Sequence, residues 1–297
     1  MLVLCCASIW PAPEGVASSR EGAESVVVNP NMILRWAMNR HGICVGMLAL
    51  VITVLAGCVS KDYLVSTTEY RSKVRTLGVV PLLVDTNSAI QHPERSVLIQ
   101  ILRENNREKH AYLIQKLKKK ADYFDVRQVA GDPAELFSAL VSGSTPAVKK
   151  NDFYRGYQFN AAAVGEVCQK NAVDSLLIVA LGGAQVPLTH WDRTRLGYLT
   201  TEYNVILASA AVVSRDGKLM WEYNSSPKDP FLELQYPDFD EAHYNKTNDV
   251  RLKFVSLDGV KRILQKTSTS LLNASVLPEV YEKLLDDVAD HMKLGWK

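Results

Sequence analysis

The residues best suited to chemistry stand together at the end of an apolar run. The run from Ile43 to Ala56 closes with Leu55-Ala56-Gly57-Cys58. A cysteine thiol is a strong nucleophile once it loses its proton, and Cys58 directly follows two small residues that let an extended chain enter a narrow protease site. The run is shorter than the roughly 20 apolar residues that a membrane-spanning helix requires. The stretch therefore predicts a cysteine that is processed and modified.

This arrangement resembles the lipobox of bacterial lipoproteins, in which a basic residue, here Arg40, and an apolar core precede Leu-small-small-Cys. The resemblance implies a diacylglyceryl group on Cys58, signal-peptidase cleavage between Gly57 and Cys58, and an acylated new amino terminus. Two or three lipid chains anchor a protein stably, because each buried CH₂ adds about 0.8 kcal/mol. Val59 stands where Asp favours the inner membrane in that family, which implies the outer membrane. The alternative is an uncleaved anchor or a buried helix that ends in an ordinary cysteine.

The resemblance also divides the chain. Residues 38–57 form the expected signal peptide, because Met38-Asn39-Arg40-His41 is similar to a basic leader whereas residues 1–37 are not. We expect translation to begin at Met38 or Met32 and residues 1–37 to lie outside the protein. Residues 58–74 are polar and mixed in charge, which favours a tether, and residues 75–297 are expected to form a single domain that faces the periplasm.

The composition argues against nucleic acid as a partner and against an intrachain disulfide. The chain has 34 basic and 32 acidic residues, a formal net charge of +2, which provides no field for nucleic acid. Cys168 is the one cysteine after Cys58, so we expect no intrachain disulfide. Cys168 is predicted to be a small buried residue of a helix, with a reactive thiol as the alternative.

The apolar patterns predict an α/β (α+β) fold with a mixed sheet of about five strands, flanked by helices. In chain order we expect a strand within 75–85, one broken helix or two helices in 93–122, a strand at 124–129, a helix from 132 to about 141, a loop from 142 to 151, a helix from 160 to 171 and a buried strand at 175–181. Residues 175–223 are expected to form an antiparallel meander that turns at Asp216-Gly217. A long loop at 224–250 and helices at 258–272 and 278–292 follow.

The order of these elements resembles the α/β domain of CsgG-like curli-secretion lipoproteins and the amino-terminal domain of the TolB protein. The matching motifs are Leu77-Gly78-Val79-Val80-Pro81-Leu82, Phe124-Asp125-Val126 and the approach Val173-Asp174-Ser175-Leu176-Leu177-Ile178. The resemblance implies the same fold and, as one alternative, a subunit of an oligomeric secretion channel. The glycine that these families often place after the last motif is absent, and no clear pore-forming hairpin pattern is present.

The loop 189–195 is chemically the most mixed part of the domain. His190, Trp191, Arg193 and Arg195 could bind an anion or a protein partner, and an ordinary hairpin tip is the alternative. Gly182-Gly183 lacks the further glycines and following helix of a phosphate cradle, so we expect a turn or strand bulge and no nucleotide. The run Lys118-Lys119-Lys120 favours a solvated helix face that complements the helix dipole, with a membrane-surface contact as the alternative.

No catalytic or metal-binding motif stands out. The sequence has no Gly-x-Ser-x-Gly and no His-Glu-x-x-His, and the histidines of the domain, His92, His110, His190, His243 and His291, are scattered. We therefore expect no cofactor, no metal and no enzymatic activity. The expected function is a non-catalytic outer-membrane lipoprotein that scaffolds or recruits components of the cell envelope. A secretion-channel subunit and an envelope hydrolase are the alternatives.

Overall fold

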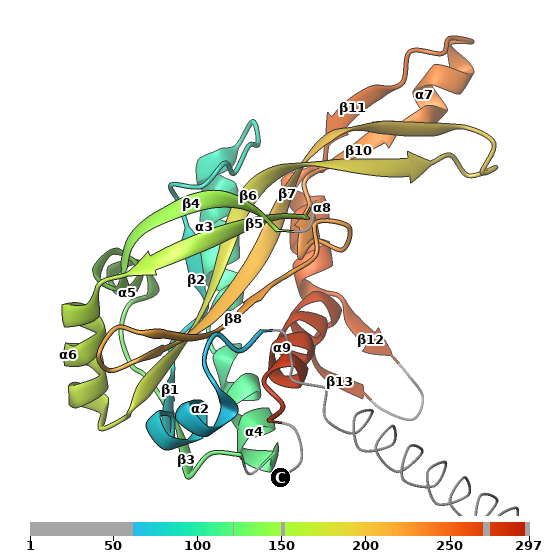
Figure 1. Cartoon of the computed structure of the whole chain (residues 1–297). Helices are drawn as coiled ribbons and strands as arrows, with labels where there is room; N and C mark the ends of the chain where they lie inside the picture. The colour runs from blue at the N-terminus through green and yellow to red at the C-terminus, as the bar shows by residue number, and fades with distance from the viewer. Residues whose placement is uncertain (1–61, 121, 150–151, 270–273, 295–297) are drawn as a thin grey trace, which may run out of the picture. The chain divides into compact units, whose positions relative to one another are not determined.

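The computed structural model describes residues 62–120, 122–149, 152–269 and 274–294. The signal peptide and Cys58, which carry the lipobox prediction, lie outside the described residues. Two 17-residue strands, β6 (Ser175–Trp191) and β7 (Tyr198–Ser214), form an antiparallel hairpin on which the fold is built. Figure 1 shows this hairpin running from the centre of the sheet far beyond its flanking helices.

The hairpin lies at the centre of a mixed, seven-stranded sheet in the described part of the chain. Its order is β3-β1-β6-β7-β8, with β2 also paired to β6 and β9 to β7. The additional strands are β1 (Thr76–Val79), β2 (Leu83–Asp85), β3 (Asp125–Gln128), β8 (Leu219–Asn224) and β9 (Leu232–Glu233). β1 pairs in parallel with both β3 and β6, and β2 pairs in parallel with β6, whereas β6, β7 and β8 form the expected antiparallel meander. The predicted mixed α/β fold is therefore confirmed.

Strand alternation sorts the core into two layers. Along β6, Leu177, Val179 and Leu181 face one apolar cluster, whereas Leu176 and Ile178 face another. The first cluster is covered by α2 (Thr67–Lys73), α3 (Arg95–Asn106), α4 (His110–Lys120), α8 (Leu257–Gln265) and α9 (Glu279–His291). The second is covered by α5 (Pro133–Leu140) and α6 (Ala161–Asn171). Every strand at the centre is therefore buried on both faces.

Local sequence explains where the helices begin and end. The Asp132 carboxylate accepts hydrogen bonds from the backbone N–H groups at the start of α5, and the Asn160 side chain does the same for α6. Glu108 has φ of 62° and separates α3 from α4, so of the two alternatives predicted for residues 93–122, one broken helix or two helices, the second is confirmed. Among the described residues, no helix combines the length and the apolar character needed to cross a bilayer.

Two predicted loops are regular structure instead. Residues 142–149 belong to β4 (Val141–Lys149), which pairs with β5 (Asp152–Phe159) in a second hairpin, so the loop prediction was wrong for these residues. The range 224–250 contains β9, β10 (Gln235–Asp238) and α7 (Phe239–Tyr244), and β10 pairs with β11 (Arg251–Phe254). In both places the strand pairs with a segment that lies nearby in the chain.

Three further expectations need correction. Gly182 and Gly183 are neither a turn nor a bulge, because they pair with Leu207 and Ile206 inside the β6–β7 ladder. The helix expected to reach residue 272 ends at Gln265 and is followed by β12 (Thr267–Thr269), which pairs with β13 (Ala274–Pro278). Residues 62–74, expected within a tether, include α2 and place Tyr70 and Val74 in the core.

Candidate partner-binding site at the end of the hairpin

The outer half of the hairpin has its own small core. Val186, Leu188, Tyr203 and Val205 are buried together, and Leu252 of β11 packs against them. On β6 their neighbours Gln185, Pro187 and Thr189 are exposed, because successive side chains of a strand point to opposite faces, whereas on β7 the neighbours Asn204 and Ile206 are buried. We call the outer hairpin (184–207) and the segment 232–254 the distal lobe. Figure 1 shows β10, β11 and α7 lying beside the outer hairpin.

The turn that closes the hairpin is internally bonded. The Asp192 backbone N–H donates to the Gly197 carbonyl at 2.9 Å, and the Asp192 carboxylate accepts from the Leu196 N–H at 3.1 Å. Desolvation raises the pKa of Asp192, but hydrogen bonds from the Thr194 hydroxyl and the backbone outweigh it, so the pKa lies below its ordinary value. Arg195 adopts the left-handed conformation at φ of 60°. The tip is thus an ordered turn that holds its side chains in place.

Three large apolar side chains are exposed at this tip. Trp191 and Tyr198 are cross-strand partners whose ring centroids lie 4.9 Å apart. Their exposed fractions are 55% and 62%, and that of Leu196 is 88%. Leaving such surface in water costs about 25 cal/mol for each Å². We call Trp191, Leu196 and Tyr198 the apolar tip.

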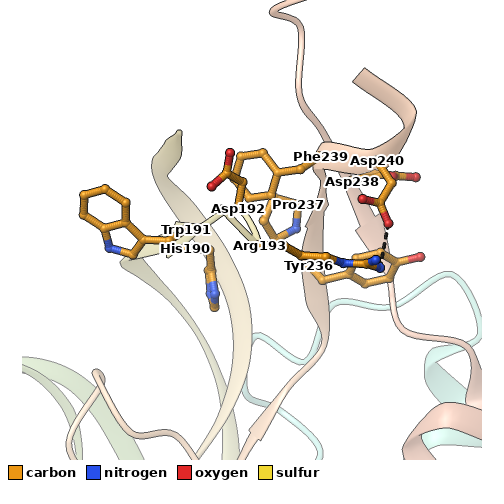
Figure 2. Close-up of a pocket in the computed structure, with 9 residues that line it drawn as sticks. All are labelled: His190, Trp191, Asp192, Arg193, Tyr236, Pro237, Asp238, Phe239 and Asp240. Atoms are coloured by element: carbon orange, nitrogen blue, oxygen red, sulfur yellow. Dashed lines mark hydrogen bonds and ion pairs between the residues drawn. The ribbon is translucent and has the colours of Figure 1, made fainter. Parts of the chain in front are cut away.

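An ion pair connects the turn of the hairpin, which carries the apolar tip, to α7. The Arg193 guanidinium donates to the Asp240 carboxylate at 2.8 Å, across a depression lined by residues 190–193 and 236–240. In Figure 2 the Arg193 side chain reaches toward Asp240, whereas Trp191 points away from the depression. Both charged groups are largely exposed, so the pair contributes no more than about 1 kcal/mol. The contact orients the guanidinium more than it stabilises the fold.

His190 faces the opposite side of β6 from Trp191. Its Nε2 lies 3.3 Å from the Glu233 carboxylate, an ion-pair distance without hydrogen-bond geometry, and its ring centroid lies 4.6 Å from that of the buried Tyr203. Burial raises the pKa of Glu233, and His190 only partly opposes that effect. Burial also raises the pKa of Tyr203, and the nearby Glu233 carboxylate adds to the rise. Tyr203 is buried in the lobe, whereas His190 and Glu233 are half-buried, and His190 also lines the depression beside Arg193.

The structure therefore divides the four predicted contact residues. Trp191 and Arg193 belong to the exposed end, and Arg195 lies in the turn. His190 is half-buried: its ring lies near Glu233 and Tyr203, and it also lines the depression. The sequence reasoning missed Leu196, Tyr198 and Asp240. The alternation that continues from β6 could have indicated Tyr198, but Asp240 needed the tertiary arrangement.

The remaining predicted sites have simple outcomes. Gly57 and Cys58 lie outside the described residues. Within the ranges that the structure describes, no three His, Cys, Asp or Glu side chains are grouped closely enough to hold a metal ion. Cys168 is buried in α6, as predicted, and burial raises the pKa of its thiol to about 11.

Comparison with known proteins adds little. No family model matches the chain, and no curated protein matches it. Among solved structures, one described as a neuraminyllactose-binding hemagglutinin homolog from Helicobacter pylori aligns with 74% of this chain and 86% of that chain, at 8% identity and a TM-score of 0.37. A likeness at this TM-score carries no argument about function.

Proposed function

We propose that this protein is a non-catalytic lipoprotein of the outer membrane, anchored through Cys58, that recruits another envelope protein through its apolar tip. The observation that supports the recruiting role is the exposure of Trp191, Leu196 and Tyr198 beside Arg193. Trp, Tyr and Arg dominate the few residues that supply most of the binding energy in protein interfaces. The anchoring role is supported by the sequence Leu55-Ala56-Gly57-Cys58 alone.

The order of the tip supports the same proposal. Association costs free energy whenever side chains and loops must be fixed, and a surface that is already ordered avoids part of this cost. The bonds of Asp192 fix the turn, and the Arg193–Asp240 pair orients the guanidinium before a partner arrives. The aromatic pair adds a rigid surface with few rotatable bonds.

Site-specific crosslinking in intact cells tests this function. A photoreactive amino acid at Leu196 should form a discrete adduct with one envelope protein, whereas the same group at Val97, an exposed apolar position on α3, should not. The adduct should be lost when Trp191 and Tyr198 are both replaced by Ala. Each hot-spot aromatic is worth about 2 kcal/mol or more, so affinity should fall at least about thirtyfold.

Two controls keep the result specific. Tyr244→Ala removes a more exposed aromatic side chain on α7 and should leave the adduct unchanged. Cys58→Ala should abolish the adduct only by removing the protein from the membrane. Equal adducts from Leu196 and Val97, or an adduct that survives the double aromatic replacement, would contradict recruitment through the tip.

A further inference from the structure

The place where the described chain begins is firmly held. Tyr63 forms a β-bridge with Trp221, and its ring centroid lies 4.8 Å from that of Tyr70 in α2. Its hydroxyl donates to the Met292 carbonyl, just after α9, at 2.9 Å. The chain therefore leaves the domain at a fixed point, between α2, β8 and the end of α9.

This point limits where an anchor on Cys58 can be. Cys58 lies five positions before Tyr63 in the chain. A fully extended chain spans at most about 3.6 Å per position, or about 18 Å in total. The surface around Tyr63 is therefore the surface nearest to the bilayer if Cys58 is lipidated. This step rests on the proposed function.

Exposed apolar side chains lie around the same point. Phe124 is 82% exposed and Leu64 is 48% exposed. Leu64 adjoins Tyr63 in the chain, and Phe124 follows Tyr123, whose hydroxyl lies 3.0 Å from that of Tyr70. The Phe124 backbone N–H donates to the Arg75 carbonyl at 2.9 Å, which fixes its position beyond the end of α2.

Basic residues surround these side chains. Lys118, Lys119 and Lys120 end α4, and Lys293 follows α9. The Asp290 carboxylate lies 3.1 Å from the ammonium groups of both Lys120 and Lys293, so one acidic side chain pairs with two basic ones. Asp125 is likewise shared, by Lys118 at 3.8 Å and Arg127 at 2.7 Å. Asp122 lies beside Tyr63 and Tyr123, and both Asp62 and the basic Arg71 lie beside Tyr63, so six basic residues stand against four acidic ones around this point.

We infer that this face, formed by Leu64, Phe124, Lys118, Lys119 and Lys293, rests on an anionic bilayer surface. Phe124 and Leu64 enter the headgroup region, and the lysines contact acidic lipid headgroups, which attract basic residues near the membrane surface. Bilayer contact at this face supplements the lipid on Cys58. It also accounts for a phenylalanine that the fold leaves almost fully in water.

This orientation directs the distal lobe away from the membrane. Trp221, the bridge partner of Tyr63, pairs with Val212 of β7, and β7 continues to Tyr198 at the tip. At about 3.3 Å per residue, the apolar tip lies about 46 Å along the strand from that point. Figure 1 shows α2, β3 and the end of α4 at the opposite end of the domain from the tip. The molecule therefore holds its tip clear of the bilayer.

Spin labels test this orientation in the mature lipidated protein, reconstituted in vesicles of equal parts phosphatidylglycerol and phosphatidylcholine. Phe124→Cys carries the label, and Leu196→Cys is the matched control, since both positions are more than 80% exposed. Cys58 is blocked by its lipid and Cys168 is buried, so labelling is confined to the new cysteine. The label at 124 should be more accessible to oxygen than to a water-soluble nickel complex, and the label at 196 should show the reverse.

The charge contribution has its own test. Replacing Lys118 and Lys119 by Gln, or omitting phosphatidylglycerol, should shift the label at 124 toward water. Equal aqueous accessibility at 124 and 196, or deeper burial at 196, would overturn the inference. Mass analysis of the amino-terminal peptide separates the two proposals. An acylated Cys58 with an aqueous label at 124 defeats only this inference, whereas an unmodified Cys58 defeats the proposed anchoring.

Discussion

His110 is the clearest residue whose ionisation the fold disfavours. Its side chain is buried at the start of α4, and within the described structure neither ring nitrogen has a hydrogen-bond partner. Burial lowers the pKa of His110, with only weak opposition from Glu108. Close by in the chain, Asn106 accepts a hydrogen bond from the Tyr281 hydroxyl at 2.8 Å. A charge on His110 would therefore enter a region that joins α3, α4 and α9.

This burial predicts a loss of stability in mild acid. The unfolded chain binds a proton on His110 near pH 6.5, whereas the folded protein does so only at lower pH. The free energy of unfolding should therefore fall as the pH drops below about 6.5, by at most about 1.4 kcal/mol per pH unit, until the lower folded pKa is reached. Urea unfolding from pH 7.5 to 5 measures it. His110→Leu should flatten this dependence, and the exposed His243→Leu should not; equal slopes in all three proteins would refute the assignment.

Cys168 gives a second prediction for a single residue. Burial raises the pKa of the thiol to about 11, although Arg215 opposes the rise. Since the thiolate is the reactive form, a thiol reagent at pH 8 should leave the folded domain unmodified and react fully after unfolding in urea. Rapid modification of Cys168 in the folded protein would contradict its buried position.

At the level of elements, Gly183 is the residue at which the loop after β2 packs closely on β6. The loop that follows β2 crosses directly over this residue, and a Cβ atom there would lie 2.2 Å from the Ile90 backbone nitrogen and 2.4 Å from the Ala89 carbonyl carbon. The Gly183 N–H also donates to the Ser88 hydroxyl at 2.8 Å. The glycine is therefore needed for close backbone approach, not for a turn.

Gly183→Ala should destabilise the domain, because either the loop or β6 must move. The expected loss is about 1–3 kcal/mol, the usual cost of overpacking. Gly143→Ala in β4 is the matched control, since the nearest atom to its new Cβ is the Gln158 side-chain oxygen at 3.4 Å. It should change stability by less than about 0.5 kcal/mol in urea unfolding. Similar values for the two variants would show that the loop yields freely.

The elements also show how far the sequence could predict the fold. The run from Ser175 to Leu181 was predicted as a buried strand, because its apolar residues are continuous. Its extension to Trp191 was missed, because Gly182-Gly183 and Pro187 are typical of turns and loops, whereas here they lie within the long ladder with β7. The same limit applies to the site. Trp191 and Arg193 could be named from their types, whereas the contact with Asp240 depends on the tertiary position of α7.

At the level of the whole molecule, the segment before β1 is part of the domain. Tyr70 of α2 is fully buried, and Tyr63 bonds to both β8 and the residue after α9. The sequence suggested a tether here because the segment is polar and mixed in charge, and the core contacts of a few aromatic residues in it could not be foreseen.

A comparison of two unlipidated fragments tests this contribution. A protein of residues 62–297 should be more stable than one of residues 75–297, because the shorter protein exposes the site of Tyr70. Removal of a buried aromatic side chain costs about 3–5 kcal/mol, so the shorter fragment should unfold at clearly lower urea concentration or fail to fold. Tyr70→Ala in the longer fragment should reproduce most of the loss. Equal stability of the two fragments would contradict this contribution and would favour a tether at residues 62–74.

The account depends most on the state of Cys58, which is best measured by mass spectrometry of the intact amino-terminal peptide from the native membrane protein. We expect a peptide that begins at Cys58, carries a diacylglyceryl thioether and an acylated amino group, and lacks every residue before position 58. A peptide that begins elsewhere, or an unmodified Cys58, would contradict the membrane anchor and the recruiting role that is built on it.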